Sequence, residues 1–61
     1  MKYVVKVTAQ DGTVWYLDIL GLLSTFEKAY GYDNREDADY DGYLTVLKYI
    51  EHNPTITIVE M

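Results

Sequence analysis

Two stretches near the N-terminus alternate apolar and polar side chains in the two-residue period of a β-strand. The first covers Lys2–Thr8 and the second covers Thr13–Leu20. Between them Asp11-Gly12 is a strong turn signal, and Ala9-Gln10 widens the loop. The pattern predicts an antiparallel hairpin. One face of it is expected to present Tyr3, Val5, Val7, Trp15, Leu17 and Ile19.

The opposite face of this hairpin also carries large apolar side chains, namely Val4, Val14 and Tyr16. A sheet with one solvated face shows a cleaner alternation of apolar and polar residues. We therefore expect the second face to meet a helix or another subunit.

The second half of the chain predicts a helix followed by a strand. Asp33 or Asn34 can cap the helix, because a short side-chain oxygen accepts from the free N–H groups of the first turn. Asn53 can take the left-handed conformation that ends a helix, and Pro54 cannot continue one. Thr55–Glu60 then alternates as a strand. Helical spacing places one apolar set on a single face: Tyr40, Tyr43, Leu44, Leu47 and Ile50.

The segment Tyr43–Ile50 also permits a strand, because it is rich in strand-forming residues and could pair with Thr55–Glu60 as a second hairpin. Gly42 weakens a helix by about 1 kcal/mol relative to alanine. The acidic start of the segment and the stop signals at its end favour the helix.

A short helix is expected after the hairpin, where Gly21 ends the second strand. Ser24 and Glu27 match a capping box, in which each side chain satisfies a free N–H group of the first turn. This helix would run to Tyr30, with Gly31 as a left-handed stop. The alternative is that Ala29–Tyr32 is a short extended piece that joins the sheet.

These elements predict a single α+β domain over residues 1–61. A small antiparallel sheet contains the N-terminal hairpin and the C-terminal strand, and the main helix packs on one face of it. The chain has no cysteine, so disulfides cannot stabilise so small a core. Hydrophobic residues make up 49% of the chain, and we expect a homodimer that covers the surplus.

The formal charge is −5, from ten acidic residues against five Lys and Arg. Half of the acids lie within the nine residues Asp33–Asp41. Direct binding to nucleic acid or to an anionic membrane requires a basic footprint, so we expect neither. A protein with a basic surface is the natural partner. No apolar run is long enough to span a bilayer or to act as a signal peptide, and we expect a cytoplasmic protein.

Asp37, Asp39 and Asp41, followed by Gly42, match the first half of a calcium-binding helix–loop–helix motif. The twelfth loop position should be a bidentate glutamate and is Lys48 instead. An acidic helix start explains the same residues, and we prefer that interpretation. A weak calcium-binding module remains an alternative hypothesis, and no metal site or cofactor is predicted.

Catalytic chemistry has little support in this sequence. His52 is the only histidine, and its place near a helix C-terminus is explained by the helix dipole. The clustered acids are expected on a solvated turn, where nothing raises a carboxyl pKa for acid catalysis. There is no glycine-rich phosphate loop. We therefore expect a protein that is not an enzyme.

The seven tyrosines suggest a protein-binding surface, because tyrosine contributes a large rigid contact area with a polar tip. Tyr49 falls on the helix face opposite Tyr43 and Leu47, so we expect it to be exposed. Tyr32 is a second candidate.

The segment Gly21–Gly31, with Ser24, Phe26, Glu27 and Tyr30, resembles the small uracil-DNA glycosylase inhibitors of Bacillus phages. In that family a hairpin with an Asp-Gly turn precedes a short helix containing a similar pattern. The resemblance implies a homodimeric DNA mimic that grips an apolar loop of the glycosylase in a groove between subunits. It also implies that Phe26 and Tyr30 line the groove and that Glu27 replaces a phosphate.

The resemblance, together with the acidic composition, thus implies a phage-type inhibitor of a host enzyme or defence protein that acts by DNA mimicry, with uracil-DNA glycosylase as the most specific target. The alternative is a structural or regulatory interaction module that uses a tyrosine-rich surface. The residues expected to bind the partner are Phe26, Glu27, Tyr30, Glu36, Asp37, Asp39, Asp41 and Tyr49.

Overall fold

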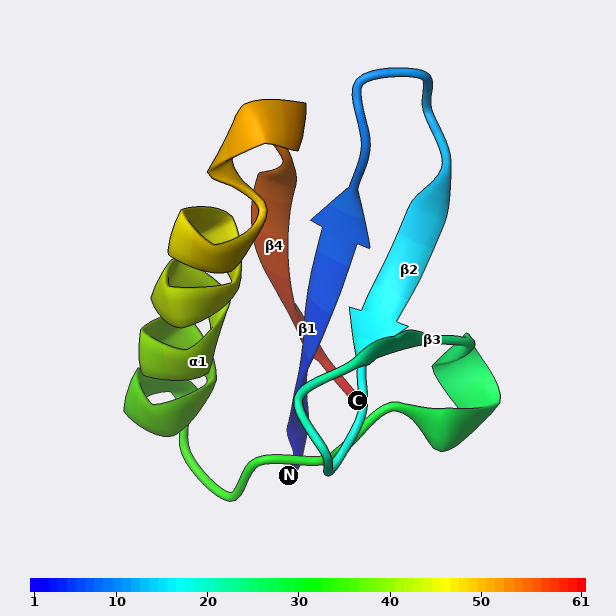
Figure 1. Ribbon diagram of the computed structural model, residues 1–61. Coiled ribbons are helices and arrows are strands. Elements are labelled where there is room, and N and C mark those ends of the chain that lie inside the picture. Colours follow the sequence, from blue (N-terminus) through cyan, green and yellow to red (C-terminus); the bar gives the residue numbers. More distant parts are fainter.

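The computed structural model describes residues 1–61 and confirms the α+β fold (Figure 1). A four-stranded antiparallel sheet is covered on one face by a single main helix, and two short 3₁₀ turns flank that helix in the chain. The elements in chain order are β1 (Tyr3–Thr8), β2 (Val14–Leu17), β3 (Leu23–Ser24), a 3₁₀ turn (Phe26–Lys28), α1 (Arg35–Lys48), a 3₁₀ turn (Ile50–His52) and β4 (Thr55–Glu60).

The strand order is β3-β2-β1-β4, so β1 is central and β4 forms one edge. The predicted hairpin β1–β2 is present, with Val7 opposite Trp15, and β4 pairs with β1 over its whole length. The strand β3 was not predicted. It pairs with β2 through Tyr16 opposite Ser24 and Leu17 opposite Leu23.

The hairpin turn uses the predicted glycine. Gly12 has a φ of 91°, in the left-handed region that glycine adopts without strain. The Asp11 carboxylate accepts from the Thr13 backbone N–H at 2.9 Å. The second strand is shorter than predicted and ends at Leu17 instead of Leu20, because the chain turns at Asp18.

The core lies between α1 and the sheet. Its buried residues come from β1, β2, α1 and the segment before the helix, and they are Val5, Val7, Leu17, Tyr32 and Ala38.

Val4 is also fully buried but points to the other face of the sheet by strand alternation. There Phe26 packs edge-on against Tyr16, with ring centroids 5.1 Å apart. The second face was expected to meet a helix or another subunit, and within one chain only a short 3₁₀ turn packs against it.

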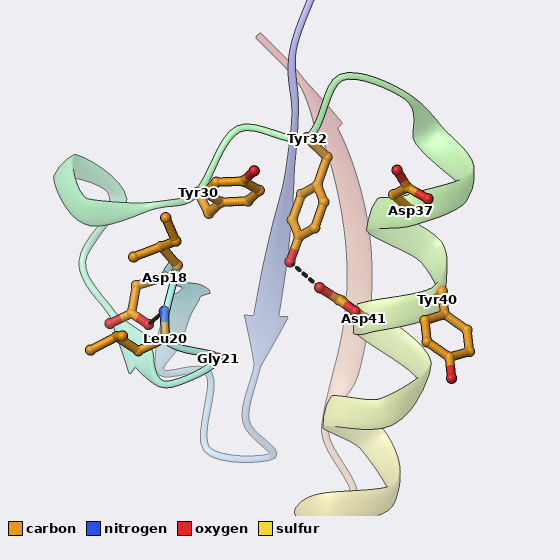
Figure 2. A pocket seen from close by; sticks show the side chains of 9 residues that line it. Asp18, Leu20, Gly21, Tyr30, Tyr32, Asp37, Tyr40 and Asp41 are labelled. Atoms are coloured by element: carbon orange, nitrogen blue, oxygen red, sulfur yellow. Dashed lines mark hydrogen bonds between the residues drawn. The ribbon is translucent and has the colours of Figure 1, made fainter.

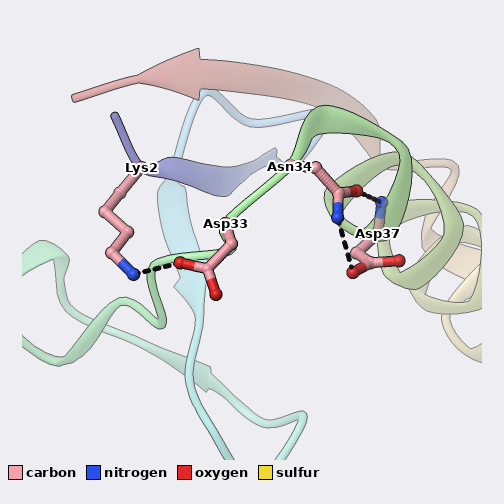
Figure 3. A network of polar contacts seen from close by, with 4 residues as sticks. All are labelled: Lys2, Asp33, Asn34 and Asp37. Atoms are coloured by element: carbon pink, nitrogen blue, oxygen red, sulfur yellow. Dashed lines mark hydrogen bonds and ion pairs between the residues drawn. The ribbon is translucent and has the colours of Figure 1, made fainter.

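The ends of the main helix follow the predicted signals. Asn34 is the N-cap, and its side-chain oxygen accepts from the Asp37 backbone N–H at 2.9 Å (Figure 3). Asn53 has a φ of 45° and terminates the 3₁₀ turn that follows α1. Tyr43–Lys48 is helical, so the alternative of a second hairpin is wrong.

The side of the helix that packs on the sheet differs from the prediction. Ala38, Gly42 and Thr45 are buried, whereas the larger residues Tyr40 and Tyr43 are 63% and 60% exposed. A Cβ atom at Gly42 would lie 2.8 Å from Cγ2 of Ile56, so only glycine allows the helix to approach β4 this closely. The predicted apolar face therefore points outward: Tyr40, Tyr43, Leu44 and Leu47, with Ile50 exposed in the following 3₁₀ turn.

The predicted short helix is also only partly correct. Ser24 lies in β3, and Thr25 caps the 3₁₀ turn without a side-chain hydrogen bond, so no capping box forms. The turn ends before Tyr30, and Gly31 does not have a positive φ. The extended alternative for Ala29–Tyr32 is the better description, because Tyr32 and Tyr3 exchange two backbone hydrogen bonds of 2.9 and 2.7 Å.

Candidate functional site

A groove runs along α1 on the side that faces β2 and β3. It arises because α1 covers only β1 and β4, which leaves the same face of β2 open beside the helix. Two adjoining cavities of about 530 and 170 Å³ form this groove, and both are lined by Gly21 and Asp41. One wall is the loop after β2, and the other wall is α1 (Figure 2).

The loop wall is organised by Asp18. Its carboxylate accepts from the backbone N–H groups of Leu20 and Leu22, both at 2.9 Å. Gly21 closes the turn with a φ of 78°. Because Asp18 fixes the backbone in this way, the side chains of Ile19 and Leu20 are held in solvent at 75% and 77% exposure. Two apolar side chains on a loop that hydrogen bonds hold in one conformation form a preorganised contact surface.

Two tyrosines lie between the walls. The ring of Tyr30 meets the ring of Tyr32 edge to face, with centroids 4.8 Å apart and planes at 87°. The Tyr32 hydroxyl donates to the Asp41 carboxylate at 2.7 Å (Figure 2). Burial, together with this carboxylate, raises the pKa of the Tyr32 phenol well above its usual value. Tyr32 therefore stays protonated and acts as a fixed donor.

The helix wall supplies two acids. Asp37 and Asp41 are four residues apart, so they lie on one flank of α1, and both line the larger cavity. Asp37 is held by the N-cap, because the Asn34 side-chain amide donates to its carboxylate at 3.1 Å (Figure 3). Asp39 turns to the opposite flank and forms an ion pair of 3.8 Å with Arg35.

The groove is consequently negative at one end. Asp18, Asp37 and Asp41 line the larger cavity, and no basic residue does. Lys48 is the only cation along the groove and lines the smaller cavity. Apolar side chains stand among these acids, so the surface combines carboxylates with exposed aromatic and aliphatic groups.

The structure brings together three of the eight predicted partner-binding residues: Tyr30, Asp37 and Asp41. Phe26 lies on the other face of the sheet, against Tyr16, and Glu27 is exposed beside it. Glu36 and Asp39 are exposed outside the groove.

The prediction that Tyr49 is exposed is wrong. Tyr49 is half-buried and lines a third cavity with Trp15, Leu23 and His52. Its position follows from helix rotation, because residues 38, 42, 45 and 49 share the side that packs on the sheet.

The residues that line the larger cavity but were not among the predicted binding residues include Asp18, Ile19, Leu20 and Tyr40. Ile19 and Leu20 were assigned to the end of the second strand, and Gly21 was interpreted only as the end of that strand, although a glycine within an apolar run is also a signal for a loop. Tyr40 was assigned to the buried helix face.

The possible calcium loop is not formed. Asp37, Asp39 and Asp41 all lie within α1, whose rotation of 100° per residue directs Asp39 away from the other two. No group of three acidic, histidine or cysteine side chains converges as metal ligands would. The preferred interpretation, an acidic helix start, agrees with Glu36 and Asp37 in the first turn behind the Asn34 cap.

Comparison with protein-family models, curated proteins and solved structures found no match to this chain. Its α-helix is too short and too polar to cross a bilayer.

Proposed function

We propose that this protein is a small, acidic, non-enzymatic protein-binding module. It is of the phage inhibitor type and acts in the host cytoplasm on an enzyme or defence protein that binds nucleic acid. The observation that carries the proposal is the groove beside α1, where Asp18, Asp37 and Asp41 line the same cavity as the exposed side chains of Ile19 and Leu20.

The mixture of charges and apolar groups supports a protein partner. Carboxylates attract the Lys and Arg side chains of a nucleic-acid-binding surface, and they steer association at low salt. The apolar loop and Tyr30 then offer an area that a protein surface can bury. DNA itself is repelled by a chain with a net charge of −5.

The acids of the groove have structural hydrogen bonds that suit binding better than proton transfer. Asp18 is occupied by loop amides, and Asp41 accepts from a tyrosine that stays protonated. Fixed carboxylates of this kind present charge in a constant geometry, as a mimic of phosphates requires.

Uracil-DNA glycosylase is the most specific target we propose, on the resemblance of Gly21–Gly31. The geometry alters the residues that would carry such binding. Phe26 and Tyr30 lie on opposite faces of the sheet, so they do not line one groove of a single chain. We therefore assign the contact to Tyr30, Asp37 and Asp41.

A second candidate function, a module that binds through tyrosines, is favoured by the outer stripe of α1. Tyr40, Tyr43, Leu44 and Leu47 are all exposed there and lie at helical spacing on one side. Binding through this stripe would change little with salt, whereas binding through the groove acids weakens as salt rises.

The test is inhibition of purified bacterial uracil-DNA glycosylase on uracil-containing single-stranded DNA. We expect inhibition at low salt that weakens as salt rises. The amide variant Asp37→Asn, Asp41→Asn should inhibit at least about tenfold less well, because losing the charges removes about 1.4 kcal/mol or more of charge-pair free energy. Asp39→Asn is the matched control, since it removes one charge from the other flank. No inhibition at any salt concentration rejects the glycosylase as the target.

A further inference from the structure

The outer edge of β4 is an open, self-complementary strand edge. The sheet ends there, because the strand order is β3-β2-β1-β4 and β4 pairs with β1 alone (Figure 1). The strand is six residues long and contains neither proline nor lysine, which are common protections of a free edge. We propose that two copies of this protein associate through β4, forming one continuous antiparallel sheet.

The hydrogen bonds to β1 determine which backbone groups of β4 are free. The Met61 N–H donates to the Lys2 carbonyl at 2.8 Å, so Met61 faces β1. Antiparallel pairing alternates, and Thr55, Thr57 and Val59 therefore face β1 as well. Ile56, Ile58 and Glu60 direct their N–H and C=O groups away from the sheet.

One register uses all of these free groups. With Ile58 opposite its own copy, Ile56 of each chain lies opposite Glu60 of the other, and every outward N–H meets an outward C=O. If Ile56 instead faces Ile58, Glu60 falls opposite Pro54, which has no N–H. If Ile58 faces Glu60, Ile56 lies opposite a position beyond Glu60, where β4 ends. The two-fold axis through Ile58 is therefore the preferred arrangement.

The side chains in this register are compatible. Thr57 lies beside Val59 of the other copy on one face, and the two Ile58 side chains adjoin on the helix face. Glu60 is opposite an isoleucine, so no like charges are placed directly across the seam.

The helices also fit. Because α1 lies over both β1 and β4, the axes of the two α1 helices would lie about two strand spacings, roughly 10 Å, apart. Packed helices have interaxial distances of about 8–10 Å. The flank of α1 nearest the seam carries Val46 and the Arg35–Asp39 ion pair, which is neutral overall. The unpaired acids Asp37 and Asp41 lie on the opposite flank, so the dimer leaves the groove open.

The dimer also resolves two weaknesses of the single chain. Only eight of 61 residues are buried, and a domain of this size commonly needs disulfides, a bound metal or a second subunit for stability. After pairing, the only remaining sheet edges are the two copies of β3, each two residues long. Very short edge strands resist further pairing, so the assembly closes at two copies.

The test uses the mass of the full chain in solution and amide hydrogen exchange. We expect twice the 7.1 kDa of one chain, and slow exchange at Ile56, Ile58 and Glu60 as well as at the residues that face β1. Glu60→Pro removes one outward N–H from each copy without touching the β1 ladder. It should weaken dimerisation about tenfold or more while far-UV circular dichroism stays unchanged.

Glu60→Gln is the control, because it removes the charge but keeps the N–H, and it should remain dimeric. A monomer at the concentrations used for nuclear magnetic resonance overturns the proposal. A dimer whose Ile56, Ile58 and Glu60 amides exchange freely overturns it too, because such a dimer uses another surface. Neither result bears on the groove acids, so this inference and the proposed function fail separately.

Discussion

The Tyr32 hydroxyl donates a 2.7 Å hydrogen bond to the Asp41 carboxylate and thereby joins the sheet to the helix. Tyr32 is itself fixed by two backbone hydrogen bonds to Tyr3 in β1. The acid that gives the groove part of its charge is thus also a structural acceptor. This hydrogen bond belongs both to the fold and to the candidate site. Removing it should lower the stability of the fold more than it lowers the affinity for a partner.

We predict that Tyr32→Phe lowers the free energy of unfolding by about 1–2 kcal/mol, because it removes a hydrogen bond to a charged acceptor that is partly buried. Urea denaturation followed by circular dichroism measures the change. Tyr43→Phe removes an exposed hydroxyl from the outer helix face and should alter stability by less than about 0.5 kcal/mol. Equal effects of the two substitutions would contradict the role given to Tyr32.

The raised pKa of Tyr32 predicts a loss of stability in alkali. In the unfolded chain a tyrosine ionises near its ordinary value of 10.0, whereas folded Tyr32 keeps its proton to higher pH. The contribution of Tyr32 is therefore complete below pH 10 and declines as the pH rises above it. A phenolate absorbance titration should show one of the seven tyrosines ionising last, and Tyr32→Phe should remove that step.

Gly42→Ala should destabilise the fold even though alanine favours helices. The added methyl group would meet Cγ2 of Ile56 at 2.8 Å and force α1 away from β4. We expect a net loss of about 1–2 kcal/mol, because overpacking outweighs the gain of about 1 kcal/mol in helix propensity. A double-mutant cycle with Ile56→Ala should show favourable coupling. If the effects of Gly42→Ala and Ile56→Ala on stability were additive, the strain caused by the added methyl group would not lie between these two residues.

Asn34→Ala should cost about 1 kcal/mol, since it leaves the Asp37 N–H of the first turn without its acceptor. Thermal unfolding of the two proteins measures the difference. The neighbouring Asp33→Ala is the comparison, because Asp33 forms only an exposed ion pair with Lys2 (Figure 3). Such pairs contribute little, so Asp33→Ala should unfold close to the parent temperature.

The sequence predicted the helices and strands better than it predicted which side of the main helix packs on the sheet. The alternation of β1 and β4, the Asn34 cap and the left-handed Asn53 are local signals, and the structure confirms each. The packing side of α1 was predicted wrongly, because burial was assigned to the largest apolar residues. Close approach to the sheet instead selects the small residues Ala38 and Gly42.

The candidate site was only partly predictable for a related reason. Asp37 and Asp41 were identified from the acidic cluster, but their separation from Asp39 depends on helix rotation. The loop at Asp18 depends on side-chain hydrogen bonds to Leu20 and Leu22, which interrupt a run that otherwise continues as a strand. Local apolar patterns do not encode such a turn.

The central claim is that the groove acids bind a protein partner. The most direct measurement immobilises the parent, the variant Asp37→Asn, Asp41→Asn and the control Asp39→Asn, and quantifies by mass spectrometry what each retains from a bacterial lysate at low salt. Both amide replacements keep an oxygen that can accept the hydrogen bonds from Tyr32 and Asn34.

We predict that the parent and Asp39→Asn retain the same nucleic-acid-binding protein, that salt releases it, and that the double variant loses it. Equal retention by the double variant, or a partner that salt does not release, would contradict the claim.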